Sequence, residues 1–396
     1  MNILKRKELV NRIIDYDSHD WVKLLTGVRR SGKTTLIKTM IEELKRRGVS
    51  EENILYISFR SWKYEFNDYY EMYNWIKDTI DGLAGKVYLF FDDVEEYENW
   101  QGLANHFRKR ESIEIFAAVN HSKFYILGDC ELAGRSMQFE VYPFSFKEFV
   151  EYKKQFTDDE SISDMFIEYL RFGGMPETLQ YDEPSDKYWI LEDTFNVIKY
   201  CDFKKDSDLE SFLIDDFLRY MRETFTESFS KKQLNRYLYG MFDSSTTSKC
   251  LSLLEKSKFM PNSHKLHDNY RFQLDDRYYL IDHGFFNQAN HYFNYSPESL
   301  LKNIVYVELL RRGYHVFYYQ KRERYIDFVA TKLDKTILIQ FDYIFANDNI
   351  IKNEIRDLNS YPHEHEKYII TTGDYDLSEY GVRHLNIIDF LMGSEI

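Results

Sequence analysis

Short apolar runs alternate with segments of helical periodicity over the amino-terminal part of the chain. Residues 34–47 carry apolar side chains at the spacing of one helix face. The apolar runs predict strands, and they lie at residues 21–26, 54–59, 87–91, 113–119 and 138–142. Short apolar strands separated by helices are typical of a mostly parallel sheet with helices on both faces. The pattern therefore predicts an α/β domain over residues 1–150.

The pattern becomes mainly helical from residue 150 to residue 258. Two short helices are expected at residues 231–239 and 246–256, and apolar strands at 270–274 and 278–281. Two helices joined by a turn and followed by a hairpin give the winged-helix order. We expect a helical and winged-helix domain over residues 151–290.

Strands and helices alternate again in the last hundred or so residues. An amphipathic helix is expected at 301–312, and Gly313 is expected to end it, since glycine commonly follows the last helical residue. Strands are expected at 315–319, 325–330, 336–343 and 368–372, with a helix at 352–359. These elements predict a small separate α/β domain over residues 291–396.

Composition agrees with a folded chain of several domains. The chain has 396 residues, of which 43% are hydrophobic, so two or three domains are expected and disorder is not. The formal net charge of −14 opposes non-specific attraction to nucleic acid, so any DNA binding must rest on a local site.

Cysteine use and hydropathy point to a soluble protein of the cytoplasm. Cys130, Cys201 and Cys250 are far apart and form no CxxC pair, so neither a cysteine zinc cluster nor a disulfide framework is expected. No stretch approaches the roughly 20 apolar residues that span a bilayer.

The clearest motif follows the first predicted strand. It matches G-x-x-x-x-G-K-[ST] in full, with Thr35 next on the predicted helix: Gly27, Val28, Arg29, Arg30, Ser31, Gly32, Lys33, Thr34. The glycines let backbone N–H groups surround an anion, and the helix beginning near Lys33 adds its positive dipole end. We expect Lys33 to reach the β- and γ-phosphates of a nucleoside triphosphate and Thr34 to bind Mg²⁺.

A second buried strand ends in Asp92 and Asp93. Asp92 is expected to hold Mg²⁺ through water. Asp93 takes the position of the acid that orients the attacking water, although aspartate is one methylene shorter than the usual glutamate. A misplacement of about 1 Å can cost ~10²-fold in rate, so slow hydrolysis is expected.

With these residues in place, the chain resembles prokaryotic AAA-type P-loop ATPases that carry a helical, winged-helix and restriction-endonuclease-like tail. No base-reading motif is evident, so the residues themselves do not choose between ATP and GTP; the resemblance implies ATP. It covers nearly the whole chain and rests on GVRRSGKT (27–34), LFFDD (89–93), Gly134 with Arg135, YPFSFKEF (142–149), GGMPE (173–177), YYLIDHG (278–284) and IDFV (326–329).

The same resemblance suggests further site residues. Asn120 is the nearest match to the residue that senses the γ-phosphate, and Arg135 matches a phosphate-facing arginine acting in cis or from a neighbouring subunit, with a surface ion pair as the alternative. In the carboxy-terminal domain, Glu308 and Asp327 match metal ligands of a nuclease. The third element there reads Gln340-Phe341-Asp342 and lacks the lysine and the acid of E-x-K, so a degenerate domain without cleavage is expected.

Three functions remain open on these grounds. The first is an ATPase whose cycle switches the conformation of the carboxy-terminal domains against a DNA or protein partner. The second is an ATP-regulated nuclease, and the third is a nucleotide-dependent DNA-binding regulator. The second requires Glu308 and Asp327 to bind metal. The third works through the winged-helix segment, which is as often a protein-contact module and whose basic residues could contact phosphates: Lys231, Lys232, Arg236, Lys249, Lys256 and Lys258.

Overall fold

The computed structural model describes residues 4–16, 20–61, 66, 68–120, 131–157, 159–204, 210–238, 240, 243–266, 272–289, 297–343, 348–375 and 380–396. These residues form two compact units. The first comprises residues 1–142 with 256–258, and the second comprises 143–255 with 259–396. Among the described helices, none is long and apolar enough to cross a membrane.

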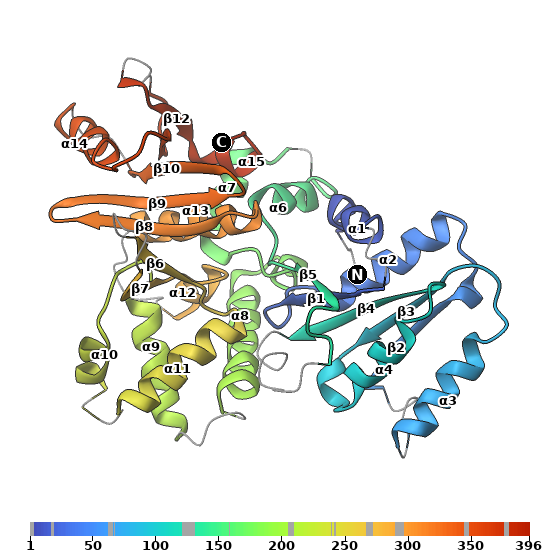
Figure 1. The fold of residues 1–396 in the computed structure, drawn as a ribbon. Helices are drawn as coiled ribbons and strands as arrows, with labels where there is room; N and C mark the ends of the chain where they lie inside the picture. Colours follow the sequence, from blue (N-terminus) through green and yellow to red (C-terminus); the bar gives the residue numbers. More distant parts are fainter. Residues whose placement is uncertain are drawn as a thin grey trace. The chain divides into compact units, whose positions relative to one another are not determined.

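A five-stranded parallel sheet forms the centre of the first unit (Figure 1). Its strands run in the order β2-β3-β4-β1-β5. They span β1 (Val22–Gly27), β2 (Ile54–Ser58), β3 (Val87–Asp92), β4 (Ile113–Asn120) and β5 (Ser136–Glu140). The predicted parallel α/β sheet is confirmed; β1 lies one residue after the predicted 21–26, and β5 lies two residues before the predicted 138–142.

Helices cover both faces of this sheet because its strands are apolar on both sides. In β1, Leu25 belongs to the cluster under α1 (Lys7–Ile14) and α2 (Lys33–Arg46), and the neighbouring Leu24 belongs to the opposite cluster. That second cluster includes side chains of α3 (Tyr69–Ile80) and α4 (Trp100–Phe107). The alternation of a strand thus gives each face its own core.

The second unit begins with a helical segment, as the sequence predicts. Ser145 and Ser230 begin two of its helices, each through a reciprocal capping box with the residue three positions on. The helices span α6 (Phe146–Lys153), α7 (Ile162–Phe172), α8 (Pro184–Ile198), a π-helical turn (Lys199–Lys204), α9 (Ser211–Glu223), α10 (Lys231–Tyr237), α11 (Ser244–Ser257) and α12 (Gly284–Ala289).

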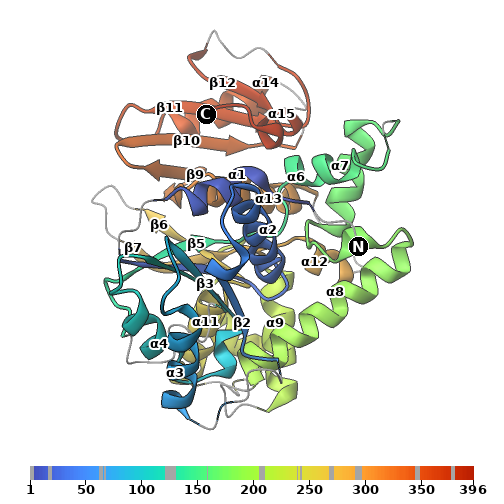
Figure 2. The same ribbon diagram turned by 90° about the vertical axis from the view of Figure 1, so that its right-hand side faces the viewer.

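A seven-stranded mixed sheet in the order β12-β11-β10-β9-β8-β6-β7 completes the second unit. Helices α13 (Pro297–Arg311) and α14 (Asp348–Leu358) lie on opposite faces of it (Figures 1 and 2), and α15 (Ile387–Met392) follows the last strand. The strands span β6 (Asn262–Leu266), β7 (Phe272–Tyr278), β8 (His315–Lys321), β9 (Arg324–Lys332), β10 (Lys335–Phe341), β11 (Glu366–Thr371) and β12 (Arg383–Asn386).

The hairpin of the middle segment differs from the prediction. Its strands are β6 and β7, whereas the sequence indicated 270–274, whose first two residues lie outside the described ones, and 278–281. The sequence NSHKL of β6 has no run of apolar residues, which is why the strand was missed. β6 also pairs in parallel with β8, so one sheet crosses the domain boundary expected near residue 290, and the three-domain division stays a prediction.

Helix α13 is packed on most of its sides, so its predicted amphipathic character is wrong. Leu300, Leu301 and most of the following residues through Leu309 are buried. Asn303 lies among them, fully buried, and its side chain bonds both the N–H and the C=O of Leu280 at 2.7 and 2.9 Å. A polar residue in this helix therefore marks a second packing surface and not a solvent face.

Candidate functional site

The strand order of the first unit places the loop after β1 at a reversal point. β1 is flanked by β4 and β5; the chain leaves β1 towards β2 on one side and leaves β4 for β5 on the other. In open α/β sheets, ligands bind outside the carboxyl ends of the strands at such a point. The G-x-x-x-x-G-K-T loop lies there and leads directly into α2.

The backbone of this loop requires its glycines. Gly27 has φ +148°, and a Cβ on it would lie 2.3 Å from the carbonyl oxygen of Val141. Gly32 has φ +97°, in the region that other residues rarely adopt. Arg30 adopts φ +63° as well. The chain thus wraps tightly before α2 begins at Lys33, whose first turn offers backbone N–H groups to an anion.

The polar side chains of the loop are buried at its centre. Lys33 is 8% exposed, and its Nζ donates to the carbonyl oxygens of Gly27 and Val28 at 2.8 and 2.9 Å. Ser31 is fully buried, and its Oγ has no hydrogen-bond partner among the residues that the structure describes. A buried hydroxyl without a partner carries a free-energy cost that a ligand oxygen would remove.

Asp92 ends β3 beside the start of α2. Its Oδ1 accepts from the Thr34 hydroxyl at 3.2 Å, and its Oδ2 accepts from the Tyr56 hydroxyl at 2.9 Å. Burial raises the pKa of the Asp92 carboxyl, and the neighbouring charge of Asp93 raises it further. The structure brings Asp92 and Thr34 together as the sequence predicts, and their oxygens are ligands that suit Mg²⁺.

Asp93 turns away from this pair. Its φ is +53°, its Oδ2 accepts from the Ser58 hydroxyl at the end of β2 at 3.0 Å, and its Oδ1 lies 3.7 Å from Arg60. Asn120 is the last residue of β4 and sits opposite Gly27 in the sheet register. Its backbone N–H donates to the carboxylate of Glu95, a residue that the sequence analysis did not single out.

Arg135 lies at the wrong edge of the sheet for a phosphate contact within the chain. Its carbonyl oxygen accepts from Val22 N at 3.0 Å, and β5 pairs with β1 from Ser136 onwards. The residue is therefore at the amino end of β1, whereas the loop follows the carboxyl end. Five steps along a strand at about 3.3 Å each separate the two ends by roughly 17 Å. The cis role is wrong, and a contact from a neighbouring subunit stays a prediction.

Comparison with known proteins agrees with this geometry. Residues 19–150 match a family model described as an AAA domain. The chain carries an AAA-type P-loop domain. Residues 163–296 match a second family model, described as a domain of unknown function.

Individual relatives cover much of the chain. An uncharacterized protein of Haemophilus influenzae is 25% identical over 400 residues, covering 98% of this chain and 99% of its own length. Among solved structures, AMPPCP-bound DnaA from Aquifex aeolicus is 13% identical, with a TM-score of 0.35, covering 65% of this chain and 90% of that one. A STAND-class signal transduction ATPase with a tetratricopeptide repeat sensor from Pyrococcus horikoshii is 12% identical, with a TM-score of 0.32; the match covers 78% of this chain and 45% of that longer one.

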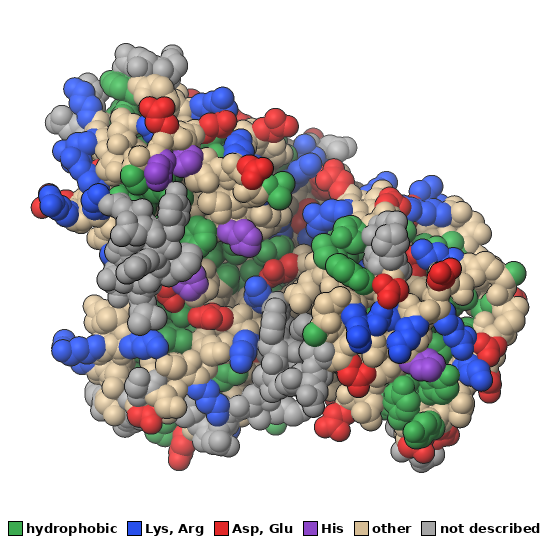
Figure 3. Space-filling model, in the orientation of Figure 1, with side chains coloured by type: hydrophobic (Ala, Val, Ile, Leu, Met, Phe, Trp, Pro, Cys, Tyr) green, Lys and Arg blue, Asp and Glu red, His purple; other side chains and the backbone are tan. Residues whose placement is uncertain are grey.

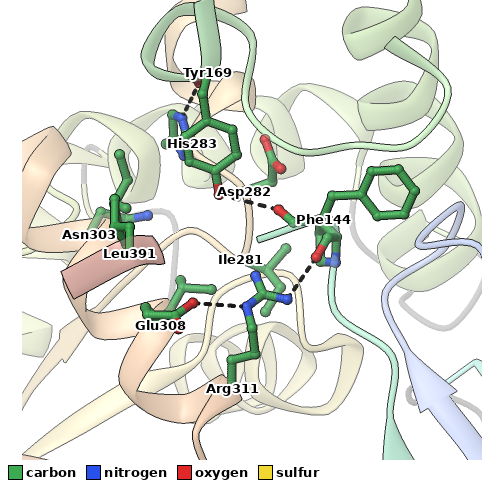
Figure 4. Close-up of a pocket in the computed structure, with 12 residues that line it drawn as sticks. Phe144, Tyr169, Ile281, Asp282, His283, Asn303, Glu308, Arg311 and Leu391 are labelled. Atoms are coloured by element: carbon green, nitrogen blue, oxygen red, sulfur yellow. Dashed lines mark hydrogen bonds and ion pairs between the residues drawn. The ribbon is translucent and has the colours of Figure 1, made fainter. Parts of the chain in front are cut away.

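Residues of the PFSF and YYLIDHG motifs of the second unit line one buried cluster (Figure 4), and Gly174 of the GGMPE motif is hydrogen-bonded to both motifs. Asp282 accepts the N–H groups of Gly174 and Gly284 at 2.7 and 2.8 Å, and Gly174 accepts from Phe144 N at 2.7 Å. Burial raises the pKa of Asp282. A Cβ on Gly174 would lie 2.1 Å from Phe144 O. These motifs are explained by packing and hydrogen bonding, since only glycine fits at position 174 between the chain segments of this cluster.

The two acids predicted as a nuclease metal pair lie in different environments. Glu308 pairs with Arg311 at 3.2 Å and with Arg312 at 2.9 Å, at the cluster of Figure 4. Asp327 is 1% exposed and pairs with Lys302 at 2.8 Å. Within the described part of the chain, no group of three or more His, Cys, Asp or Glu side chains is arranged to hold a metal ion.

Gln340 belongs to the Asp327 environment. Its Oε1 accepts from Asp327 N at 3.1 Å, and Glu354 of α14 lies beside both side chains. Burial, followed by the charge of Asp327, raises the pKa of Glu354 to about 7. The sequence analysis missed Lys302 and Glu354 because both come from helices outside the E-x-K motif, and no local pattern indicates them.

On the face that Figure 3 shows, Lys and Arg side chains are interspersed with Asp and Glu. Lys231 Nζ donates to the Ser248 hydroxyl at 2.9 Å. The interspersed signs agree with the net charge of −14 in giving little non-specific attraction to nucleic acid.

Proposed function

We propose that this chain binds ATP with Mg²⁺ at the loop after β1, hydrolyses it, and uses the cycle to switch the conformation of the segments that follow the AAA domain. The observation that carries the proposal is the convergence of Lys33, the unpartnered Ser31 hydroxyl and the Thr34–Asp92 pair at one glycine-bounded loop. Nucleotide binding agrees with the family match over residues 19–150.

Each residue of the loop has a part in this proposal. Lys33 exchanges its bonds to the carbonyl oxygens of Gly27 and Val28 for phosphate oxygens, and Ser31 gains a partner. Thr34 and Asp92 hold Mg²⁺, which supplies positive charge beside the phosphates. The backbone N–H groups at the start of α2 stabilise the anion.

A route for the switch is given by the chain itself. Val141 N donates to the carbonyl oxygen of Thr26 at 2.7 Å, and Val141 O lies against Gly27. The second unit begins two residues later, at Pro143. A change in the loop on nucleotide binding therefore displaces the segment through which the second unit is attached. Switching by ordering such a segment is a common consequence of triphosphate binding.

The test is phosphate release from ATP with Mg²⁺ by the intact chain and by Lys33→Ala, with and without duplex DNA. We expect turnover that is lost in Lys33→Ala and retained in Lys38→Ala, which removes an exposed lysine of the same helix. Stimulation by DNA supports a DNA partner. Release that persists in Lys33→Ala would refute the assignment of the loop as the hydrolysis site.

Nuclease activity is proposed to be absent from the carboxy-terminal segment. The Lys302 ammonium lies 2.8 Å from Asp327 Oδ1, where a metal ion would have to compete with it. A role in docking DNA or protein is therefore favoured over cleavage. Metal-dependent nicking of supercoiled DNA that disappears in Asp327→Ala would overturn this proposal.

A further inference from the structure

The chain turns sharply after β3, and this turn separates the acids of the run Asp92–Glu96. Asp93 is left-handed, with φ +53°, and a 3₁₀ turn follows at Val94–Glu96. A left-handed residue redirects the chain, so the side chains before and after it leave in different directions. Acids next to one another in sequence are thereby directed towards different neighbouring strands, Asp93 towards β2 and Glu95 towards β4.

Strand order decides which acid reaches the loop after β1. β3 lies between β2 and β4, and β4 lies next to β1. Asp93 bonds the hydroxyl of Ser58, on the β2 side. Glu95 accepts the backbone N–H of Asn120, on the β4 side, and Asn120 stands opposite Gly27 in the register of β1 and β4.

The electrostatic interactions of Glu95 also associate it with the phosphate loop. Lys33 and Arg29, both in the phosphate loop, exert attraction on its carboxylate. Asp93 instead faces Arg60, which also pairs with Glu96 at 3.3 Å. Glu95 is thus the partly buried acid held beside the phosphate loop, while Asp93 belongs to a surface group at the end of β2.

We propose that Glu95, and not Asp93, is the carboxylate that orients and deprotonates the water attacking the γ-phosphate. The inference rests on the proposed ATP hydrolysis. The water oxygen forms the new bond to the γ-phosphorus, and the bond from that phosphorus to the bridging oxygen breaks, leaving its electron pair on ADP. The water proton passes to the Glu95 carboxylate and then to solvent. The Asn120 N–H fixes the carboxylate for this role, since a donor at one oxygen leaves the other available.

The experiment compares carboxylate-to-amide replacements that keep side-chain size: Glu95→Gln, Asp93→Asn and the control Glu96→Gln. Single-turnover phosphate release, binding of a fluorescent ATP analogue and melting temperature are measured for each and for the wild type. We expect Glu95→Gln to lose on the order of 10²-fold or more in the rate of release, as removal of a general base does. It should keep its affinity for ATP and its melting temperature. Asp93→Asn should lose at most about threefold, and Glu96→Gln should match the wild type.

The variant Ser58→Ala gives a second, independent test of the role of Asp93. If Asp93 were the acid and Ser58 merely held it back, releasing it would accelerate hydrolysis, whereas we expect an unchanged rate. A loss in Asp93→Asn equal to or larger than that in Glu95→Gln, or acceleration in Ser58→Ala, overturns the assignment while leaving the ATPase proposal intact. A wild type that releases no more phosphate than Lys33→Ala refutes hydrolysis itself, and the role of Glu95 with it.

Discussion

Replacing Glu354 with glutamine should abolish a pH dependence of stability that the wild type shows between mildly acidic and mildly basic conditions. The carboxyl is buried between α14 and the sheet, close to the charge of Asp327, and its Oε2 has no hydrogen-bond partner among the described residues. Both burial and the Asp327 charge favour the protonated form, which raises the pKa from the ordinary 4.5 to about 7.

The direction in which stability changes with pH follows from proton binding. Between the two pKa values the folded state binds a proton that the unfolded state has released, so the free energy of unfolding falls as pH rises through this window. A shift from 4.5 to about 7 corresponds to about 3 kcal/mol at most. Glutamine keeps the neutral shape of the protonated acid, so Glu354→Gln should match the wild type at low pH and exceed it at high pH.

Urea unfolding followed by circular dichroism at about pH 5 and about pH 8 measures this difference. We expect the wild type to lose up to about 3 kcal/mol more than Glu354→Gln over the interval. Glu364→Gln, which removes an exposed carboxylate near β11, should keep the slope of the wild type. Equal slopes in the wild type and in Glu354→Gln would refute the reasoning.

Two further substitutions test packing in the second unit. Gly174→Ala should lower the free energy of unfolding by about 3 kcal/mol or more, because the new methyl would lie 2.1 Å from Phe144 O. Thermal unfolding measures this loss. In the control Gly102→Ala the nearest atom is 3.4 Å from the new methyl, so little loss is expected. Lys302→Met should cost about 3–5 kcal/mol by leaving Asp327 buried without its ion-pair partner. Adding Asp327→Asn should restore part of that loss in a double-mutant cycle, and additive losses would contradict the pairing.

Local spacing was enough to predict the G-x-x-x-x-G-K-T loop and the proximity of Thr34 and Asp92. The loop, its strand and its helix are continuous in sequence, so periodicity and glycine positions define them together. Asp92 followed from the end of a buried apolar run. The parallel sheet followed in the same way, because its strands β1 to β4 are short apolar segments.

Contacts between residues far apart in the sequence determine the site features that the sequence did not predict. The run from Asp92 to Glu96 offers four carboxylates, and only the left-handed turn at Asp93 with the strand order decides their directions. Arg135 was assigned by motif, yet the register of β5 on β1 puts it at the opposite edge. Lys302 reaches Asp327 from another element, so nothing near IDFV in the sequence indicates the pair.

The parallel pairing of β6 with β8 has a consequence for dividing the protein into fragments. A truncation after residue 290 would remove β8 and leave one edge of β6 with unpaired backbone donors and acceptors. Such an edge is a template for strand addition by other molecules, so this fragment should self-associate and precipitate. A fragment beginning at Pro143 keeps all seven strands and the carboxyl terminus, and is the better starting point for obtaining the second unit in isolation.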